Sequence, residues 1–252
     1  MSTNSTTQQL QNVFTFPFKG PDWFKKLAIG SLLILSGFII PIVPFLFVYG
    51  YGMRIMERII VQDGELYLPE WDDWGKFFTD GARLFGAGLI YALPVIFLIF
   101  LGYTVAFLPS FLIPWSESMA DTTASSFAFV PLILMMFGVG IISIGMLIAI
   151  LLGLVVPAGL GHLVAKDRFS AAFQVNEWWP IFRVNFAGFL VAFVILMGIS
   201  MIFGFIFQIL YITIILCCLL PLVVSAFSMY ISLVSMTLYA QSYSDGVHKL
   251  EE

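Results

Sequence analysis

The chain has 252 residues, of which 60% are apolar and only 10% charged, and its mean hydropathy is +1.01. A water-soluble domain carries roughly a quarter charged residues, so this chain has too few ionic side chains to cover an aqueous surface. The net charge of −4 also argues against a nucleic-acid partner, because such proteins present basic patches to phosphates. We therefore expect an all-α protein that resides in a lipid bilayer.

The two ends of the chain are polar and differ from the apolar body. Residues 1–20 are rich in Ser, Thr and Gln, which predicts a disordered N-terminal tail. Residues 244–252 form a second polar tail. Between them, residues 21–243 are expected to form a single transmembrane domain.

Stretches without charged residues locate the membrane spans, because a helix needs about 20 such residues to cross roughly 30 Å of hydrocarbon. Four stretches pass this test, and the last is long enough for two crossings. The sequence therefore predicts a polytopic bundle of about five transmembrane helices, with approximate limits 27–52, 84–108, 129–157, 184–207 and 212–240.

The first of these segments allows a second interpretation. Pro41 and Pro44 lie inside it, and each removes a backbone donor and disturbs the preceding turn. The segment can therefore cross once or turn back as a helical hairpin. A hairpin would move the N-terminus to the other side of the membrane.

The distribution of Lys and Arg predicts the orientation. With five spans, eight basic residues lie on the side of the C-terminus and the two long polar loops, and three lie on the side of the N-terminus. Cytoplasmic loops carry the excess of Lys and Arg. We expect a multi-pass protein of the cell membrane with both loops and the C-terminus in the cytoplasm, and the N-terminus outside.

The two long polar loops, residues 54–83 and 166–183, share a plan, and we refer to them as the first and second elbow. In the first, Asp63-Gly64 is a turn signal, and Pro69 suits the first position of a helix with apolar residues at helical spacing. Such a pattern predicts an amphipathic helix at the membrane surface, before the chain re-enters the bilayer. Tryptophans in the two elbows are the expected interfacial anchors: Trp71, Trp74, Trp178 and Trp179.

The segments around the two elbows also resemble each other. At an offset of 100, Arg83, Ala87, Gly88 and Ala92 align with Arg183, Ala187, Gly188 and Ala192. At an offset of 109, Gly50 and Gly52 align with Gly159 and Gly161. We interpret this as a parallel repeat of residues 27–108 and 129–207, followed by a final span at 212–240.

The first elbow carries a family resemblance. Four runs between residues 50 and 94 resemble the uncharacterised prokaryotic membrane family known as domain of unknown function 4013: Gly50-Tyr51-Gly52-Met53-Arg54, Leu68-Pro69-Glu70-Trp71-Asp72-Asp73-Trp74-Gly75, Phe77-Phe78-Thr79-Asp80-Gly81 and Tyr91-Ala92-Leu93-Pro94. The resemblance implies a multi-pass membrane protein. It implies no activity, substrate or catalytic residue.

No recognisable set of catalytic, cofactor-binding or metal-binding residues stands out. The carboxylates of the first elbow lack the alternating spacing of a calcium loop, and we interpret them as solvated residues near a helix start. His162 and His248 have no further ligand at metal-binding spacing. We expect no metal, no cofactor and no enzymatic activity. The predicted spans contain no ionisable group of the kind that ion-coupled carriers use.

Small and hydroxyl residues supply the remaining signal. Ser225, Ser228, Ser232 and Ser235 lie on one stripe of the last span, which indicates a packing seam between helices. The alternative is a hydroxyl-lined path for a solute or lipid. The pairs Ala82/Gly86, Gly188/Ala192 and Ser200/Gly204 mark close helix contacts, either within the bundle or with a partner.

These patterns predict an accessory or scaffold subunit whose partners are the lipid bilayer and other membrane-protein subunits or a second copy of the chain. The alternative function is a passive solute or lipid conduit along the serine stripe.

Overall fold

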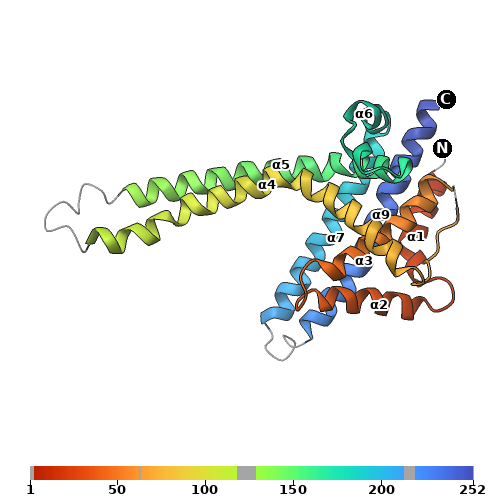
Figure 1. Cartoon of the computed structure of the whole chain (residues 1–252), viewed down its shortest axis with the longest axis horizontal. Coiled ribbons are helices and arrows are strands. Elements are labelled where there is room, and N and C mark those ends of the chain that lie inside the picture. Colours follow the sequence, from red (N-terminus) through yellow and green to blue (C-terminus); the bar gives the residue numbers. More distant parts are fainter. Residues whose placement is uncertain (1–2, 63, 118–128, 213–218, 252) are drawn as a thin grey trace. The chain divides into compact units, whose positions relative to one another are not determined.

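The computed structural model describes the chain except residues 1–2, 63, 118–128, 213–218 and 252. Every regular element in the described residues is helical, which confirms the all-α class (Figure 1). The elements in chain order are α1 (Thr3–Thr15), η1 (Phe16–Phe18), α2 (Trp23–Ser36), α3 (Val43–Ile60), α4 (Trp74–Glu117), α5 (Val130–Lys166), η2 (Phe169–Phe173), α6 (Val175–Val184), α7 (Phe186–Ile212) and α9 (Leu220–Glu251).

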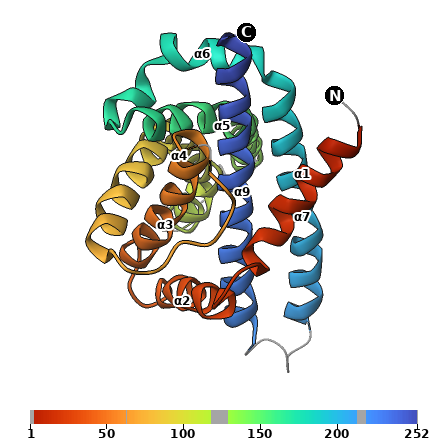
Figure 2. The same ribbon diagram turned by 90° about the vertical axis from the view of Figure 1, so that its right-hand side faces the viewer.

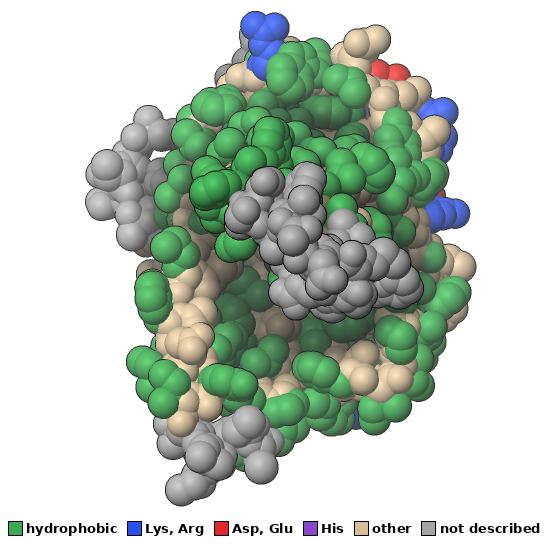
Figure 3. All heavy atoms as spheres, turned by 90° about the vertical axis from the view of Figure 1, so that its left-hand side faces the viewer, with side chains coloured by type: hydrophobic (Ala, Val, Ile, Leu, Met, Phe, Trp, Pro, Cys, Tyr) green, Lys and Arg blue, Asp and Glu red, His purple; other side chains and the backbone are tan. Residues whose placement is uncertain are grey.

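Four helices in the described part are long and apolar enough to cross a membrane. They are the stretch Trp74–Ser110 of α4, and α5, α7 and α9. Apart from residues 129, 184 and 185, these helices contain the predicted spans 84–108, 129–157 and 184–207 and most of the span 212–240, of which residues 213–218 lie outside the described part. In the space-filling view most of the described side chains are hydrophobic, and the few charged ones lie at the margin (Figure 3).

The fifth predicted span, residues 27–52, does not form one helix. Helix α2 ends at Ser36 and α3 begins at Val43, and the two helices pack against each other. The break has local causes. Pro41 and Pro44 have no N–H to donate to a continuing helix, and Ile42 has a φ of 73°, which a β-branched residue rarely adopts. The segment thus forms the helical hairpin of the second interpretation, and the single continuous helix was wrong.

Contacts divide the chain into two compact units, and the single transmembrane domain expected from the sequence stays a prediction. Unit 1 comprises Met1–Gly88 and Val155–Glu252, and unit 2 comprises Leu89–Leu154. In unit 1, α9 is the central helix and contacts α1, α2, α3, α6 and α7 (Figure 2).

One face of α9 is packed through glycines on its neighbours. Met229, Met236 and Tyr243 follow one another at intervals of seven residues, so they lie on the same side of the helix. Each side chain occupies the place that a Cβ would take on a glycine of another helix: Gly30 of α2 for Met229, Gly52 of α3 for Met236, and Gly161 of α5 for Tyr243. Gly52 and Gly161 are equivalent in the proposed repeat, and the repeat itself stays a prediction.

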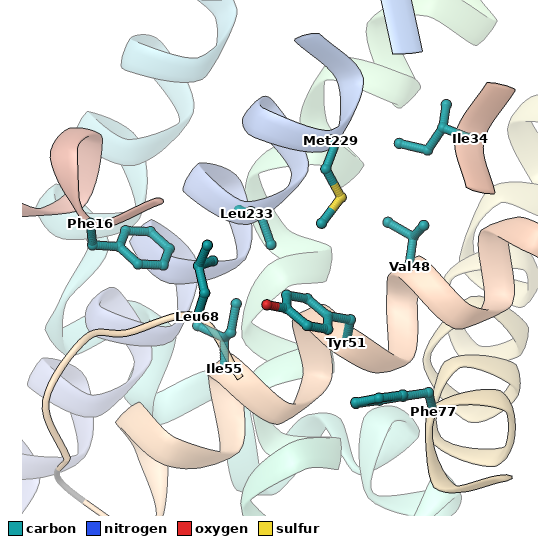
Figure 4. Close-up of a cluster of buried hydrophobic side chains, with 9 residues drawn as sticks. All are labelled: Phe16, Ile34, Val48, Tyr51, Ile55, Leu68, Phe77, Met229 and Leu233. Atoms are coloured by element: carbon teal, nitrogen blue, oxygen red, sulfur yellow. The ribbon is translucent and has the colours of Figure 1, made fainter. Parts of the chain in front are cut away.

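Around this face lies a cluster of buried apolar side chains from six parts of the chain (Figure 4). Its members are Phe16, Ile34, Val48, Tyr51, Ile55, Leu68, Phe77, Met229 and Leu233. The cluster joins α2, α3, the first elbow and α4 to α9. Where lipid replaces water, tight van der Waals packing of this kind holds helices together, because lipid tails are as apolar as the side chains.

The N-terminal segment is ordered, contrary to the expected disordered tail. Residues 3–15 form α1, in which Leu10, Val13 and Phe14 recur at helical spacing and pack against α7 and α9. The Tyr230 hydroxyl of α9 donates a hydrogen bond to the Phe14 carbonyl, at 3.2 Å. Because residues 1–20 are mostly polar, their composition gave no indication of this short apolar stripe. At the other end, α9 continues through the second polar tail to Glu251.

Unit 2 consists of the apolar parts of α4 and α5, which pack against each other. Their contact is formed by Gly102 and Gly138, where a Cβ on either residue would lie within 3 Å of the other's carbonyl oxygen. Small residues at such a position let two membrane helices approach closely. Much of the remaining apolar surface of this helix pair is exposed.

A glycine substitution tests the crossing of α3 and α4 in unit 1. A Cβ on Gly81 would overlap the Leu46 carbonyl oxygen, which is backbone and cannot rotate away. We expect Gly81→Ala to lower the stability of the purified protein by about 1–3 kcal/mol, measured as a lower unfolding temperature in detergent. Gly88→Ala is the matched control on the same helix, because its Cβ would meet nothing within 4 Å. Equal unfolding temperatures for the two variants would contradict this packing.

Candidate functional site

Residues 64–73 of the first elbow form an extended, non-helical segment, and the helix predicted from Pro69 begins instead at Trp74. Asp73 explains the later start, because its carboxylate accepts a hydrogen bond from the Lys76 backbone N–H at 2.9 Å and its carbonyl accepts one from Phe77. Asp is a preferred residue at the position before a helix. The sequence therefore contains the signal for the observed helix start at Asp73, and the start predicted at Pro69 was wrong.

Side-chain donors hold the extended elbow against α2 and α3. Lys26 Nζ donates to the Leu68 carbonyl at 3.0 Å, and the Tyr51 hydroxyl donates to the Pro69 carbonyl at 2.8 Å. In the other direction, Trp71 Nε1 donates to the Lys26 carbonyl at 3.0 Å, and its ring stacks on Tyr51 with centroids 4.2 Å apart. These contacts, which we call the elbow clasp, replace the backbone hydrogen bonds that an extended segment lacks.

Ion pairs complete the clasp. Lys26 is buried and its Nζ lies 2.6 Å from a carboxylate oxygen of the exposed Glu70. Arg54 lies 2.6 Å from Asp72 and also stands over the ring of Phe77. The hydrogen bond from Arg54 lowers the pKa of the Asp72 carboxyl. A buried ammonium requires such a partner, because an unpaired charge away from water is strongly unfavourable.

The carboxylates of the first elbow therefore do not converge on one site, because each has a different partner. Glu70 pairs with Lys26, Asp72 with Arg54, and Asp73 caps α4. Within the described residues, no three His, Cys, Asp or Glu side chains converge as metal ligands.

A second polar cluster, the His162 network, was not predicted from the sequence. His162 Nδ1 lies 2.7 Å from the Tyr243 hydroxyl, and Nε2 lies 3.0 Å from a carboxylate oxygen of Glu177. Beside it, Asn185 donates to the Ser242 carbonyl and accepts a hydrogen bond from Lys249, each at 2.7 Å. The network joins the ends of α5 and α9 to α6. Its members are far apart in the chain, so no local spacing could indicate it.

The geometry of the His162 network favours a structural role. A hydroxyl, an imidazole and a carboxylate in series resemble a catalytic arrangement, but His162 is only 3% exposed and Tyr243 is 2% exposed. A surface hollow on α6 is lined by Trp179, Pro180 and Arg183, together with Val184. None of these lining residues belongs to the network.

The serine stripe lies on α9 within the packed part of unit 1. Ser225 is buried, and Ser228, Ser232 and Ser235 are half-buried. The hydroxyls of Ser225, Ser232 and Ser235 donate to carbonyls three or four residues earlier in the same helix, at 2.6–2.9 Å. Their hydrogen-bonding capacity is used locally, as expected for residues whose small size allows close packing.

The four predicted anchors occupy different surroundings. Trp74 and Trp179 are exposed, whereas Trp71 is half-buried in the elbow clasp. Trp178 is buried and donates to the Ala172 carbonyl at 2.9 Å. The structure thus brings two of the four tryptophans to the surface, and their interfacial role stays a prediction.

Two of the three small-residue pairs are used inside the chain. Gly86 faces the ring of Phe169, and Ala192 belongs to a buried cluster with α1 and α9. The third pair, Ser200 and Gly204, is exposed, and a Cβ on Gly204 would meet nothing within 4 Å.

The elbow clasp leads to a specific prediction for Tyr51→Phe. Loss of the hydroxyl leaves the Pro69 carbonyl without its donor, and an unsatisfied buried group costs about 1–3 kcal/mol. We expect lower thermal stability and faster proteolysis within residues 61–73. Tyr67→Phe, at an exposed position of the same elbow, is the control and should cleave at the wild-type rate. Equal cleavage rates for the two variants would refute the clasp.

A second prediction concerns Tyr243→Phe. The substitution removes the hydroxyl partner of the buried His162 Nδ1, so we expect a loss of stability of about 1–3 kcal/mol by the same argument. Tyr211→Phe on α7 is the control, because Tyr211 is exposed. The measurement is the unfolding temperature of the two purified variants, and an unchanged value for Tyr243→Phe would contradict the network.

Comparison with known proteins gives the family. A model of the family described as "Protein of unknown function (DUF4013)" matches residues 33–212. No curated protein and no solved structure matches the chain. The match covers most of the chain and extends well beyond the resemblance found at residues 50–94, which it confirms. The chain therefore belongs to the DUF4013 family of proteins of unknown function.

Proposed function

We propose that this protein is a non-catalytic accessory or scaffold subunit of the cell membrane, which binds another membrane protein through an exposed stripe of α7. Membership of the family and the four apolar helices support a membrane protein. The stripe on α7 is the observation that carries the finer proposal.

The stripe consists of Ser200, Gly204 and Gln208, which are four residues apart and therefore share one face of α7. All three are exposed along a helix that is apolar enough to span the bilayer. The Gln208 amide makes no hydrogen bond with any described residue. We call this surface the α7 stripe.

A polar amide and a bare glycine are poorly suited to contact lipid tails. An amide in hydrocarbon without a hydrogen-bonding partner costs several kcal/mol by transfer estimates, roughly 4–8 in the least favourable solvent. A second helix that packs on Gly204 can approach closely and offer a partner to Gln208, and interhelical bonds of this kind contribute about 0.6–2 kcal/mol. The other two small-residue pairs already have such neighbours, which supports a helix partner for the α7 stripe.

The conduit alternative has weaker support. A solute path along α9 needs hydroxyls that are free to bond to the solute, whereas three of the four stripe serines donate to their own helix. The proposal also assigns no catalytic step to the chain, because the His162 network is shielded from a substrate.

The proposal includes an orientation, in which both elbows and the C-terminus face the cytoplasm. It is supported by the Lys and Arg residues of the elbows and of the end of α9, following the positive-inside rule.

Two glycines of α7 provide the test. In Gly204→Leu the new side chain projects from the α7 stripe, whereas Gly198→Leu places it on a different face of the helix; a Cβ at either position meets nothing within 4 Å. Both variants should therefore fold. After purification from native membranes in mild detergent, we expect wild type and Gly198→Leu to elute as a stoichiometric complex, and Gly204→Leu to lose the partner with an affinity at least about tenfold weaker, or 1.4 kcal/mol.

A photo-reactive amino acid at position 208 provides the complementary measurement. We expect it to cross-link the chain to one defined membrane protein in intact membranes, and to lose this product in Gly204→Leu. Cross-linking only to lipid or only within the same chain would overturn the proposal, as would equal complexes for the two leucine variants.

A further inference from the structure

Helices α2 and α3 are too short to cross the bilayer separately. Helix α2 has 14 residues and α3 has 18, and the last turns of α3 carry Arg54, Glu57 and Arg58. At 1.5 Å per residue, α2 is about 21 Å long, compared with roughly 30 Å of hydrocarbon. The apolar part of α3 that precedes Arg54 is shorter still. The pair nevertheless exposes many apolar residues, so its environment requires an explanation.

The start and the end of this helix pair meet the same polar segment. Lys26, in the first turn of α2, pairs with Glu70, and Arg54, near the end of α3, pairs with Asp72. These two partners are only two residues apart in the first elbow. The chain therefore returns to the side from which it set out.

The turn between the helices is apolar and exposed. Phe38 is 68% exposed and Ile39 is 85% exposed, and Ile40, Ile42 and Val43 are also exposed. Exposure of this apolar surface to water would be unfavourable, whereas lipid tails cover it without that penalty. The opposite side of the pair is occupied, because Gly30, Ile34 and Val48 pack against Met229 (Figure 4).

The backbone of the turn is suited to a medium without water. Backbone N–H groups there donate within the turn: Phe38 to Leu35, Ile39 and Ile40 to Ser36, and Val43 to Pro41. Pro41 and Pro44 have no N–H that needs a partner. Irregular backbone is tolerated at membrane depth only when its polar groups are satisfied inside the protein.

The geometry points to a re-entrant hairpin: α2 and α3 enter the bilayer together, the tip at residues 38–43 lies among lipid tails, and both ends remain on the side of the first elbow. The chain then crosses four times, and its N-terminus lies on the same side as its C-terminus. This topology differs from the one expected from five spans, in which the N-terminus lies outside. All eleven Lys and Arg residues then lie on one side.

Cysteine labelling tests the hairpin in the full chain. The two native cysteines, Cys217 and Cys218, are replaced by serine so that each variant reports a single position. Single cysteines are then introduced into a Cys217→Ser/Cys218→Ser background at exposed positions. The variants are Lys25→Cys before the hairpin, Glu65→Cys after it, Ile39→Cys at its tip and Glu251→Cys at the C-terminus.

A membrane-impermeant maleimide is applied to intact cells and to permeabilised cells. We expect Lys25→Cys, Glu65→Cys and Glu251→Cys to react only after permeabilisation. Ile39→Cys should fail to react in both cases and react only in detergent. Labelling of Lys25→Cys on the opposite side from Glu65→Cys would show that the segment crosses the membrane and would overturn the inference.

A spin label at position 39 in liposomes gives an independent measurement. We expect its relaxation to be enhanced more by oxygen, which concentrates in lipid, than by a water-soluble nickel complex, and the reverse at position 65. A tip label that responds mainly to the nickel complex would exclude insertion into lipid. These results do not depend on the α7 stripe, so the hairpin and the proposed scaffold role can fail separately.

Discussion

Close contacts between glycines and one face of α9 determine how unit 1 is assembled. Met229, Met236 and Tyr243 recur every seven residues, and each meets a glycine on a different helix. A helix with a larger side chain at the contact could not come as near, and α9 would lose the van der Waals contacts that replace the hydrophobic effect in lipid. The buried cluster that joins α2, α3, the first elbow and α4 to α9 surrounds these contacts.

Where the helices stop, side chains satisfy the backbone that would otherwise lack partners. Tyr51 and Lys26 do so for the first elbow, and Trp178 does so in the second. The sequence run Leu68 to Trp74 lies within the region that the family model matches, and it is engaged in holding a non-helical connection against the bundle. This gives the run a physical role that requires no ligand: it fixes the path of the chain between α3 and α4.

The two proposals use different surfaces of the molecule. The α7 stripe combines small and polar side chains, which suit another helix better than lipid. The hairpin tip has only large apolar side chains, which suit lipid. Both arguments follow from one constraint, namely that a polar group in hydrocarbon needs a partner and an apolar group in water is unfavourable. The membrane therefore discriminates between the two surfaces by their polarity alone.

The sequence by itself determined the membrane class, the all-α fold and the four helices that are long and apolar enough to cross a bilayer, because transfer free energies summed over about 20 residues outweigh local detail. It also contained the family resemblance, which rests on contiguous residues. The sequence did not determine two kinds of feature: where a helix breaks, and which residues far apart in the chain come into contact. The break at residues 37–42 depended on whether Pro41 and the strained Ile42 ended a helix or merely bent it, and both choices were compatible with the same hydropathy.

Only the tertiary structure decided which residues meet across long separations. His162 and Tyr243 are 81 residues apart, and Lys26 lies 42 residues from the carbonyl it binds, so no periodicity could connect them. The same reason applies to the small-residue pairs. Each one signalled a close contact, but only the folded chain showed that Gly86 and Ala192 already have neighbours and that Gly204 faces outward, because neighbours are a property of packing and not of spacing.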